Sequence, residues 1–200
     1  APQGHTVIQV DPHGQNSILI CGGSNQCITR SYIDQVLDQF HPGDYLMLQN
    51  EISELAYAVE AGCRRGLHVV LNASPLGGAL GEIDLSRLSW LLVNELECAG
   101  LADISDPFAA FDHLRAALPN TGILLTLGAE GSVAAWRGEL HREPARRTTP
   151  VDTTGAGDTY TGYFIGSLSA GKPLAEAMRL ASAAAALSLS LPGASASFPD

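Results

Sequence analysis

Positive charge is scarce in this sequence. Lys and Arg together number 11, against 21 Asp and Glu, and the formal net charge is −10. A surface of this sign repels nucleic acid and anionic membranes, so we exclude both as partners. The charge does not exclude ATP, because a helix N-terminus and Mg²⁺ can hold phosphate in an acidic protein.

The sequence also lacks the patterns of a zinc site, a disulfide framework and a membrane segment. The four cysteines form no CxxC pair and the six histidines are scattered. We interpret the cysteines as small buried residues in a reducing compartment. There is no charged and then apolar leader, and the longest apolar run, residues 181–191, is too short to cross a bilayer. Together these absences predict a cytoplasmic protein.

What is present is a regular alternation of strand and helix patterns from Asp44 to Leu189. The alternation predicts an α/β fold with a doubly wound, mainly parallel sheet flanked by helices. With 200 residues and no low-complexity linker, a single domain over 1–200 is expected. Before this region, residues 6–10 and 17–20 flank the turn signal Asp11-Pro12-His13-Gly14, which predicts a hairpin.

The most informative stretch is Asp152-Thr153-Thr154-Gly155-Ala156-Gly157-Asp158. Apolar residues at helical spacing follow it, so we predict a helix from Gly155 to about Ser169. The unbonded N–H groups and the positive dipole end of such a helix favour an anion, and glycines let a phosphoryl oxygen approach the main chain. Asp158 is then placed to take a proton from an attacking hydroxyl. A plain glycine loop capped by aspartates is the alternative.

These seven residues resemble, without substitution, the second signature of the ribokinase-like (PfkB) family of sugar kinases, Asp-Thr-x-Gly-Ala-Gly-Asp. The resemblance implies ATP-dependent transfer of the γ-phosphoryl group to a hydroxyl of ribose or a related sugar. Gly155, Ala156 and Gly157 would form the anion hole, and Asp158 would be the catalytic base that meets the sugar. The N-terminal hairpin resembles one near the substrate lid of this family, and a homodimer through that lid is an open alternative.

On the sugar side, Glu51 follows the predicted strand Tyr45–Leu48 and corresponds to a sugar-contacting Glu of the family. The alternative is that Glu51 and Glu54 are first-turn acids of a helix over residues 52–65. Asn72 begins a stretch that resembles the family's Asn-x-x-Pro turn. The segment Gly22–Asn25 only superficially echoes a sugar-binding motif.

On the nucleotide side, Asn94 and Glu97 follow the strand Trp90–Val93 and lie on one helix face, where they could hold Mg²⁺ through water. The family pattern assigns Glu97 to Mg²⁺ and Asn94 to the nucleotide phosphates; an ordinary N-cap is the alternative. The stretch from Thr126 to Gly131 resembles the family's Thr-Leu-Gly-x-x-Gly turn. Further ATP-side candidates by this resemblance are Thr126, Gly128, Gly131 and Ser182. Residues 142–147 are interpreted as a solvated connection.

The C-terminal stretch, residues 192–199, resembles the family's closing loop, which together with the signature binds a monovalent cation, usually K⁺. Oxygen ligands suit such a hard cation. Position by position, the resemblance implies a K⁺ site formed by six residues, several of them through main-chain carbonyls: Asp152, Thr154, Ser188, Leu191, Gly193 and Ser197.

The resemblance covers essentially all 200 residues, but only the later part of a family member. The first strands and the Gly-Gly-x-Gly-x-Asn motif are absent, so we expect a fragment. A kinase of the same fold acting on a nucleoside or keto-sugar, and a non-catalytic nucleotide-binding fragment, stay open. A dinucleotide oxidoreductase is disfavoured because Gly-x-Gly-x-x-Gly is missing.

Overall fold

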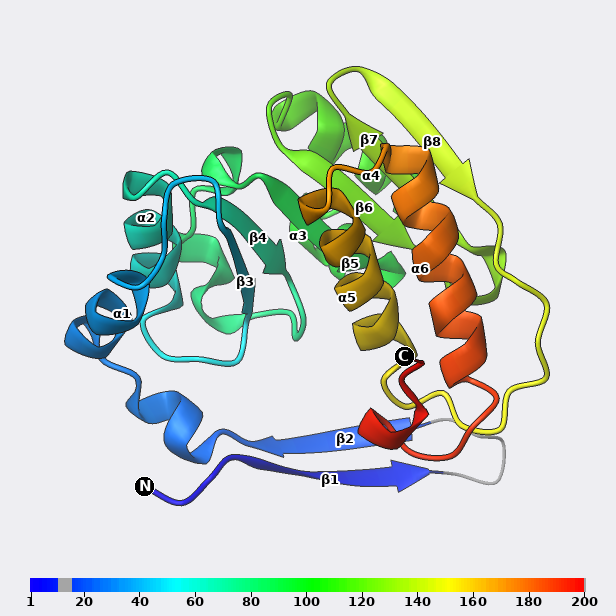
Figure 1. Cartoon of the computed structure of the whole chain (residues 1–200), viewed down its shortest axis with the longest axis horizontal. Helices are drawn as coiled ribbons and strands as arrows, with labels where there is room; N and C mark the ends of the chain where they lie inside the picture. The colour runs from blue at the N-terminus through cyan, green and yellow to red at the C-terminus, as the bar shows by residue number, and fades with distance from the viewer. Residues whose placement is uncertain (11–15, 200) are drawn as a thin grey trace. The chain divides into compact units, whose positions relative to one another are not determined.

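The computed structural model describes residues 1–10 and 16–199 and divides into two compact units, residues 1–84 and residues 85–200 (Figure 1). We call them unit 1 and unit 2. The predicted turn at Asp11–Gly14 lies outside the described residues. A single domain over 1–200 stays a prediction.

Unit 1 begins with an antiparallel pair of strands, β1 (His5–Val10) and β2 (Asn16–Cys21), as the hairpin pattern predicted. Val7, Leu19 and Ile20 on these strands are exposed by 52%, 64% and 48%. The rest of the unit contains α1 (Arg30–Leu37), β3 (Tyr45–Gln49), α2 (Leu55–Arg64) and β4 (His68–Asn72), with short 3₁₀ turns at Gly23–Cys27 and Gly78–Glu82. Strands β3 and β4 are parallel, as expected for a β-α-β unit.

The start of α2 corrects one alternative for Glu51. The helix begins at Leu55, and Glu54 precedes it in the left-handed conformation with φ of 58°. The carboxylate of Glu54 accepts a hydrogen bond from Arg30 Nε at 2.8 Å. Neither Glu51 nor Glu54 is therefore a first-turn acid of this helix, because the chain between β3 and α2 forms a turn instead.

Unit 2 contains β5 (Trp90–Asn94), α3 (Glu95–Ala102), α4 (Pro107–Ala117), β6 (Gly122–Thr126), β7 (Ser132–Trp136), β8 (Glu139–Glu143), α5 (Ala156–Ser169) and α6 (Leu174–Ser188). Its 3₁₀ turns lie at Leu85–Arg87, Gly128–Glu130 and Ser195–Ser197. Strands β5 and β6 are parallel, and β7 and β8 extend the sheet antiparallel. Helices α5 and α6 pack side by side (Figure 1). The alternating pattern and the predicted α/β class are thus confirmed.

The core of unit 2 explains why β5 and β6 are apolar over most of their length. Leu91 in β5 and Ile123, Leu124 and Leu125 in β6 have no exposed surface, as in strands covered on both faces. The rings of Trp90 and of Phe164 from α5 form a T-shaped contact with a centroid distance of 5.0 Å. Strand β8, which the sequence interpretation missed, extends into the segment that we took for a solvated connection.

The cysteine prediction holds for one residue of four. Cys98 is buried and Cys63 half-buried, whereas Cys21 and Cys27 are exposed, so their prediction as buried residues was wrong. Cys21 ends β2 and Cys27 ends the 3₁₀ turn that follows, and the local sequence pattern did not indicate their exposure. Within residues 1–10 and 16–199, no helix has both the length and the apolar character needed to cross a membrane.

Candidate functional site

The start of α5 carries the glycine stretch and defines the site. Gly155 precedes the helix in the left-handed conformation, with φ of 77°. A Cβ at this position would lie 3.2 Å from Ala194 Cβ and 3.3 Å from Phe198, so both backbone and packing require glycine. A Cβ at Gly157 would meet nothing within 4 Å. The Ala156 N–H donates to the Thr153 carbonyl at 3.4 Å, and the next two N–H groups, of Gly157 and Asp158, have no partner within the helix.

Asp158 is the only acid in the first turn of α5. Its side chain is exposed, yet the surrounding protein removes part of its water and raises the pKa of Asp158 above the ordinary aspartate value. The helix dipole acts in the opposite direction, since it favours the ionised carboxylate. A carboxylate whose pKa is raised accepts a proton more readily, which suits a general base.

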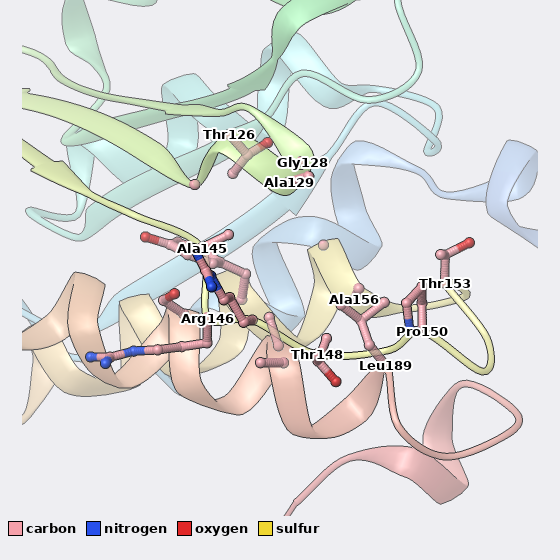
Figure 2. Close-up of a pocket in the computed structure, with 17 residues that line it drawn as sticks. Thr126, Gly128, Ala129, Ala145, Arg146, Thr148, Pro150, Thr153, Ala156 and Leu189 are labelled. Carbon is pink, nitrogen blue, oxygen red and sulfur yellow. The ribbon is translucent and has the colours of Figure 1, made fainter.

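A cavity of about 710 Å³ opens beside this helix start, entirely within unit 2 (Figure 2). Ligand pockets typically have this size. Every nucleotide-side candidate after Asn94 lines it, together with two residues of the proposed anion hole: Thr126, Gly128, Gly131, Ser182, Ala156 and Gly157. The structure therefore brings together residues that are up to 56 positions apart in the sequence, from Thr126 to Ser182.

The cavity also has a wall that sequence reasoning missed. It is the connection between β8 and α5, which Figure 2 shows from Ala145 past Arg146, Thr148 and Pro150 to Thr153. Interpreting residues 142–147 as a purely solvated connection was therefore wrong. The available signal was the arginine pair shortly before the signature, in a sequence with few basic residues.

The charge of the cavity differs from that of the whole chain. Of the described residues that line it, Arg146 and Arg147 are the only charged ones. Arg146 Nη2 lies 3.4 Å from Glu143 Oε1, a loose ion pair outside the lining. The cavity is therefore cationic in a protein of net charge −10, which favours an anionic ligand.

Two polar residues of the lining are engaged with the protein. Tyr160 OH lies 2.7 Å from Ser132 Oγ, and burial raises the pKa of Tyr160 to about 12, so the phenol stays neutral. Ser182 Oγ donates to the carbonyl of Pro144 at 3.2 Å and so ties α6 to the end of β8. The small residues Ala185 and Ala186 continue the α6 wall, which leaves the cavity wide.

Asn94 and Glu97 form a reciprocal capping box at the start of α3. The Asn94 side chain accepts from the Glu97 N–H at 2.9 Å, and Glu97 Oε2 accepts from the Asn94 N–H at 2.9 Å. The alternative that Asn94 is the N-cap of a helix is therefore confirmed. Asn94 pairs with Thr126 across β5 and β6, so it lies at the strand end beside the cavity without lining it. The magnesium and phosphate roles of the pair stay predictions.

The segments proposed for a monovalent cation are brought together. Asp152 accepts from the N–H of Thr154 and of Gly193, both at 2.9 Å, and these bonds lower the pKa of Asp152. The Val151 N–H donates to the Leu189 carbonyl at 2.8 Å. The Ser188 and Ser197 hydroxyls donate to nearby carbonyls, at 2.9 Å and 2.7 Å. The K⁺ role of these residues stays a prediction.

In unit 1, the sugar-side candidates lie after β3 and β4. Gln26 donates to the Glu51 carbonyl at 3.0 Å, and the Ser53 N–H donates to the Asn25 carbonyl at 3.0 Å. The segment Gly22–Asn25 is therefore joined to the Glu51 turn, a neighbourhood that the sequence did not reveal. The Asn72 side chain accepts from the Ser74 N–H at 3.2 Å, so it stabilises a local turn after β4.

Comparisons with known proteins match this chain over nearly its whole length. The family model described as "pfkB family carbohydrate kinase" matches residues 1–200. A deoxyribokinase of Salmonella typhi is 32% identical over 98% of this chain and 66% of its own length. The chain thus spans slightly less than two thirds of that relative.

Two solved structures extend the likeness to the fold. Ribokinase from Thermotoga maritima has a TM-score of 0.83 at 32% identity, covering 99% of this chain and 67% of the other. Ribokinase from Arabidopsis thaliana, solved with ribose and ATP, also has a TM-score of 0.83, at 30% identity, covering 100% of this chain and 67% of the other. The predicted ribokinase-like fold is confirmed.

Proposed function

The chain belongs to the pfkB family of carbohydrate kinases, and on this basis we propose that it serves ATP-dependent phosphoryl transfer to a hydroxyl of ribose or a related sugar. One observation carries the proposal within the chain itself. The start of α5, with Gly157 and Ala156, opens into the same cationic cavity as the turn Thr126–Gly131. A helix start with free N–H groups in a basic cavity suits a nucleoside triphosphate.

In this proposal the nucleotide occupies the cavity of unit 2. The Thr126–Gly131 turn, Ser182 and the arginine pair would surround its base, sugar and inner phosphates. The γ-phosphate would meet the N–H groups at the start of α5. Because phosphoryl transfer relies on positioning and charge stabilisation, this fixed array of donors does most of the protein's work.

Asp158 takes the role of general base. The sugar hydroxyl attacks phosphorus and loses its proton as the new O–P bond forms, and the Asp158 carboxylate accepts that proton. The leaving group is ADP. The position of Asp158 in the first turn of α5, and its raised pKa, both support this assignment.

Two cations complete the proposed site. Mg²⁺ neutralises phosphate charge when it is bound, and Glu97, held by Asn94 at the strand edge beside Thr126, would orient it through water. K⁺ would be held by oxygens of Asp152, Thr154, Ser188, Leu191, Gly193 and Ser197. Because these residues connect the signature to the closing loop, the K⁺ would stiffen the loop before the anion hole.

The acceptor is proposed from unit 1 and from the relatives' names. Glu51 would contact the sugar, and its turn is held in unit 1 by Gln26, which donates to the Glu51 carbonyl. The relatives act on ribose or deoxyribose, as their names say. The exposed apolar side chains of β1 and β2 support self-association through this hairpin as a further part of the proposal. A cytoplasmic setting, where ATP and sugars are available, also belongs to the proposal.

A coupled ADP-release assay tests the function. The substrates are ribose, deoxyribose, fructose and a nucleoside panel, with MgATP in K⁺ or Na⁺ buffer. The enzyme is the longest natural form of the protein, and the 200-residue chain is measured in parallel for MgATP binding. We expect turnover with a pentose and faster turnover in K⁺. Binding of MgATP without turnover on any acceptor would favour a non-catalytic nucleotide-binding protein.

A further inference from the structure

Asp152 makes the hydrogen bonds that join two loops far apart in the sequence. Its Oδ1 accepts from the Thr154 N–H at 2.9 Å, and its Oδ2 accepts from the Gly193 N–H at 2.9 Å. Residues 152 and 193 are 41 positions apart. Each carboxylate oxygen thus holds one backbone donor, on either side of the junction between the signature and the closing loop.

The joined loops carry the start of α5. Gly155, which precedes the helix, packs closely against Ala194 and Phe198. On the other side of Asp152, the Val151 N–H donates to Leu189 O at the end of α6, at 2.8 Å. The path of residues 151–155 therefore depends on contacts with residues 189–198. Among the described residues of this path, Asp152 is the only one with a charged side chain, and its carboxylate accepts a hydrogen bond from each loop.

We propose that Asp152 is a positioning residue: its carboxylate holds the signature loop and the closing loop together, and this connection aims the N–H groups of α5 at the transferred phosphate. The inference rests on the proposed function, which it refines. It assigns the side chain of Asp152 to backbone N–H groups and leaves its main-chain carbonyl available to a cation.

This role predicts a graded series of variants. Asp152→Ala removes both acceptors, whereas Asp152→Asn keeps one acceptor oxygen and loses the other. The control is Asp103→Asn in the same unit, which removes one negative charge from an exposed residue at the end of α3, away from the cavity. Amide hydrogen exchange at Thr154 and Gly193 is measured both in K⁺ and in Na⁺ without K⁺, together with the Kd for MgATP and for adenosine.

We expect both amides to exchange faster in Asp152→Ala and one of them in Asp152→Asn. The Kd for MgATP should rise about tenfold in the Ala variant and less in the Asn variant, because charge-assisted hydrogen bonds are lost. The Kd for adenosine should not change, since the loop acts on phosphates. A merely structural role would weaken both ligands alike and lower the melting temperature in proportion.

Three results would overturn the inference. Unchanged exchange of Gly193 in Asp152→Ala would show that the connection does not depend on the carboxylate. Faster exchange with an unchanged Kd for MgATP would separate the connection from the phosphate site. If K⁺ removal alone makes the exchange of the unaltered chain equal to that of Asp152→Ala, the carboxylate acts only by holding the cation. Failure of the unaltered chain to bind MgATP would instead refute the proposed function, while exchange still tests the connection.

Discussion

The two units of this chain use their charged residues in different ways. In unit 1, charged side chains cross-link helix surfaces: Tyr57 OH donates to Asp34 at 2.8 Å, and Arg65 lies 3.1 Å from Asp34 and from Asp38. In unit 2, the charged residues of the site lie on one cavity wall or at the start of a helix. Exposed ion pairs contribute little to stability, whereas charge in a cavity acts on a ligand.

This difference indicates how the proposed reaction is divided. The residues for phosphate belong to one unit with its own apolar core, so their geometry is defined within that unit. The sugar candidates Glu51 and Asn72 belong to the other unit. Substitutions in unit 2 should therefore have large and specific effects on nucleotide chemistry, and substitutions in the helix network of unit 1 should have small effects on stability.

The largest effect is expected from Asp158→Asn. Asparagine has nearly the same shape and still meets the hydroxyl, but it cannot take the proton. We expect kcat to fall by about 10²–10⁴, the usual contribution of a positioned general base. Affinity for ATP should hold or increase slightly, since a negative charge near the γ-phosphate is lost. A kcat within about threefold of the unaltered enzyme would contradict the assignment.

The pH dependence of kcat comes next. The surrounding protein removes part of the water around Asp158 and so raises its pKa, and the base works only when it is ionised. As the pH is lowered, kcat should therefore begin to fall at a pH above the ordinary aspartate pKa. Below the pKa of Asp158, kcat should fall about tenfold for each pH unit. The residual rate of Asp158→Asn should lack this decline. If kcat falls in the same way at low pH in the unaltered enzyme and in Asp158→Asn, Asp158 is excluded as the titrating group.

Gly155→Ala should disturb the connection between the helix start and the closing loop. Alanine at a φ of 77° costs about 1–2 kcal/mol, before the 3.2 Å contact with Ala194 is counted. We expect the melting temperature to fall by about 3–6 °C and MgATP binding to weaken. The matched control is Gly166→Ala in the same helix, where a Cβ meets nothing within 4 Å. That control should be neutral or slightly stabilising, because alanine favours a helix interior.

The arginine pair should affect only the charged part of the nucleotide. Arg146→Ala and Arg147→Ala should each raise the Kd for MgATP about fivefold at low salt, with less effect at high salt. Adenosine affinity should not change. Arg142→Ala is the control, since Arg142 stacks over Phe108 and does not line the cavity. Equal losses for ATP and adenosine would indicate that the arginines contact the base instead.

Tyr57→Phe in unit 1 should have the smallest effect. It removes the hydrogen bond that contributes most to the lowered pKa of Asp34. A carboxylate whose pKa is lowered contributes stability above its unfolded pKa, and this contribution is lost as the pH falls through the folded pKa. We expect a decrease of at most about 3 °C in melting temperature at neutral pH, shrinking in acid. Tyr32→Phe on the exposed face of α1 is the control. A decrease as large as that of Gly155→Ala would refute the contrast between the units.

The sequence alone determined the fold class and the start of α5. Strands such as Gly122–Thr126 and Ser132–Trp136 could be predicted to the residue, because local hydrophobic pattern and glycines report them. The anion-hole candidates were also local, since a helix start is encoded by consecutive residues. The helix α2 begins three residues later than predicted, because Glu54 adopts a left-handed conformation that the hydrophobic pattern does not predict.

Only the tertiary structure decided which segments distant in the sequence are in contact. Periodicity carries no information about contacts between distant segments, so the cavity wall at residues 145–150, the bond from Asp152 to Gly193 and the exposure of Cys21 were not predictable. Thr126, Ser182 and Arg147 lie together because packed strands and helices bring their ends to one place. The sequence determined which chemical groups were available, and packing determined which of them face one cavity.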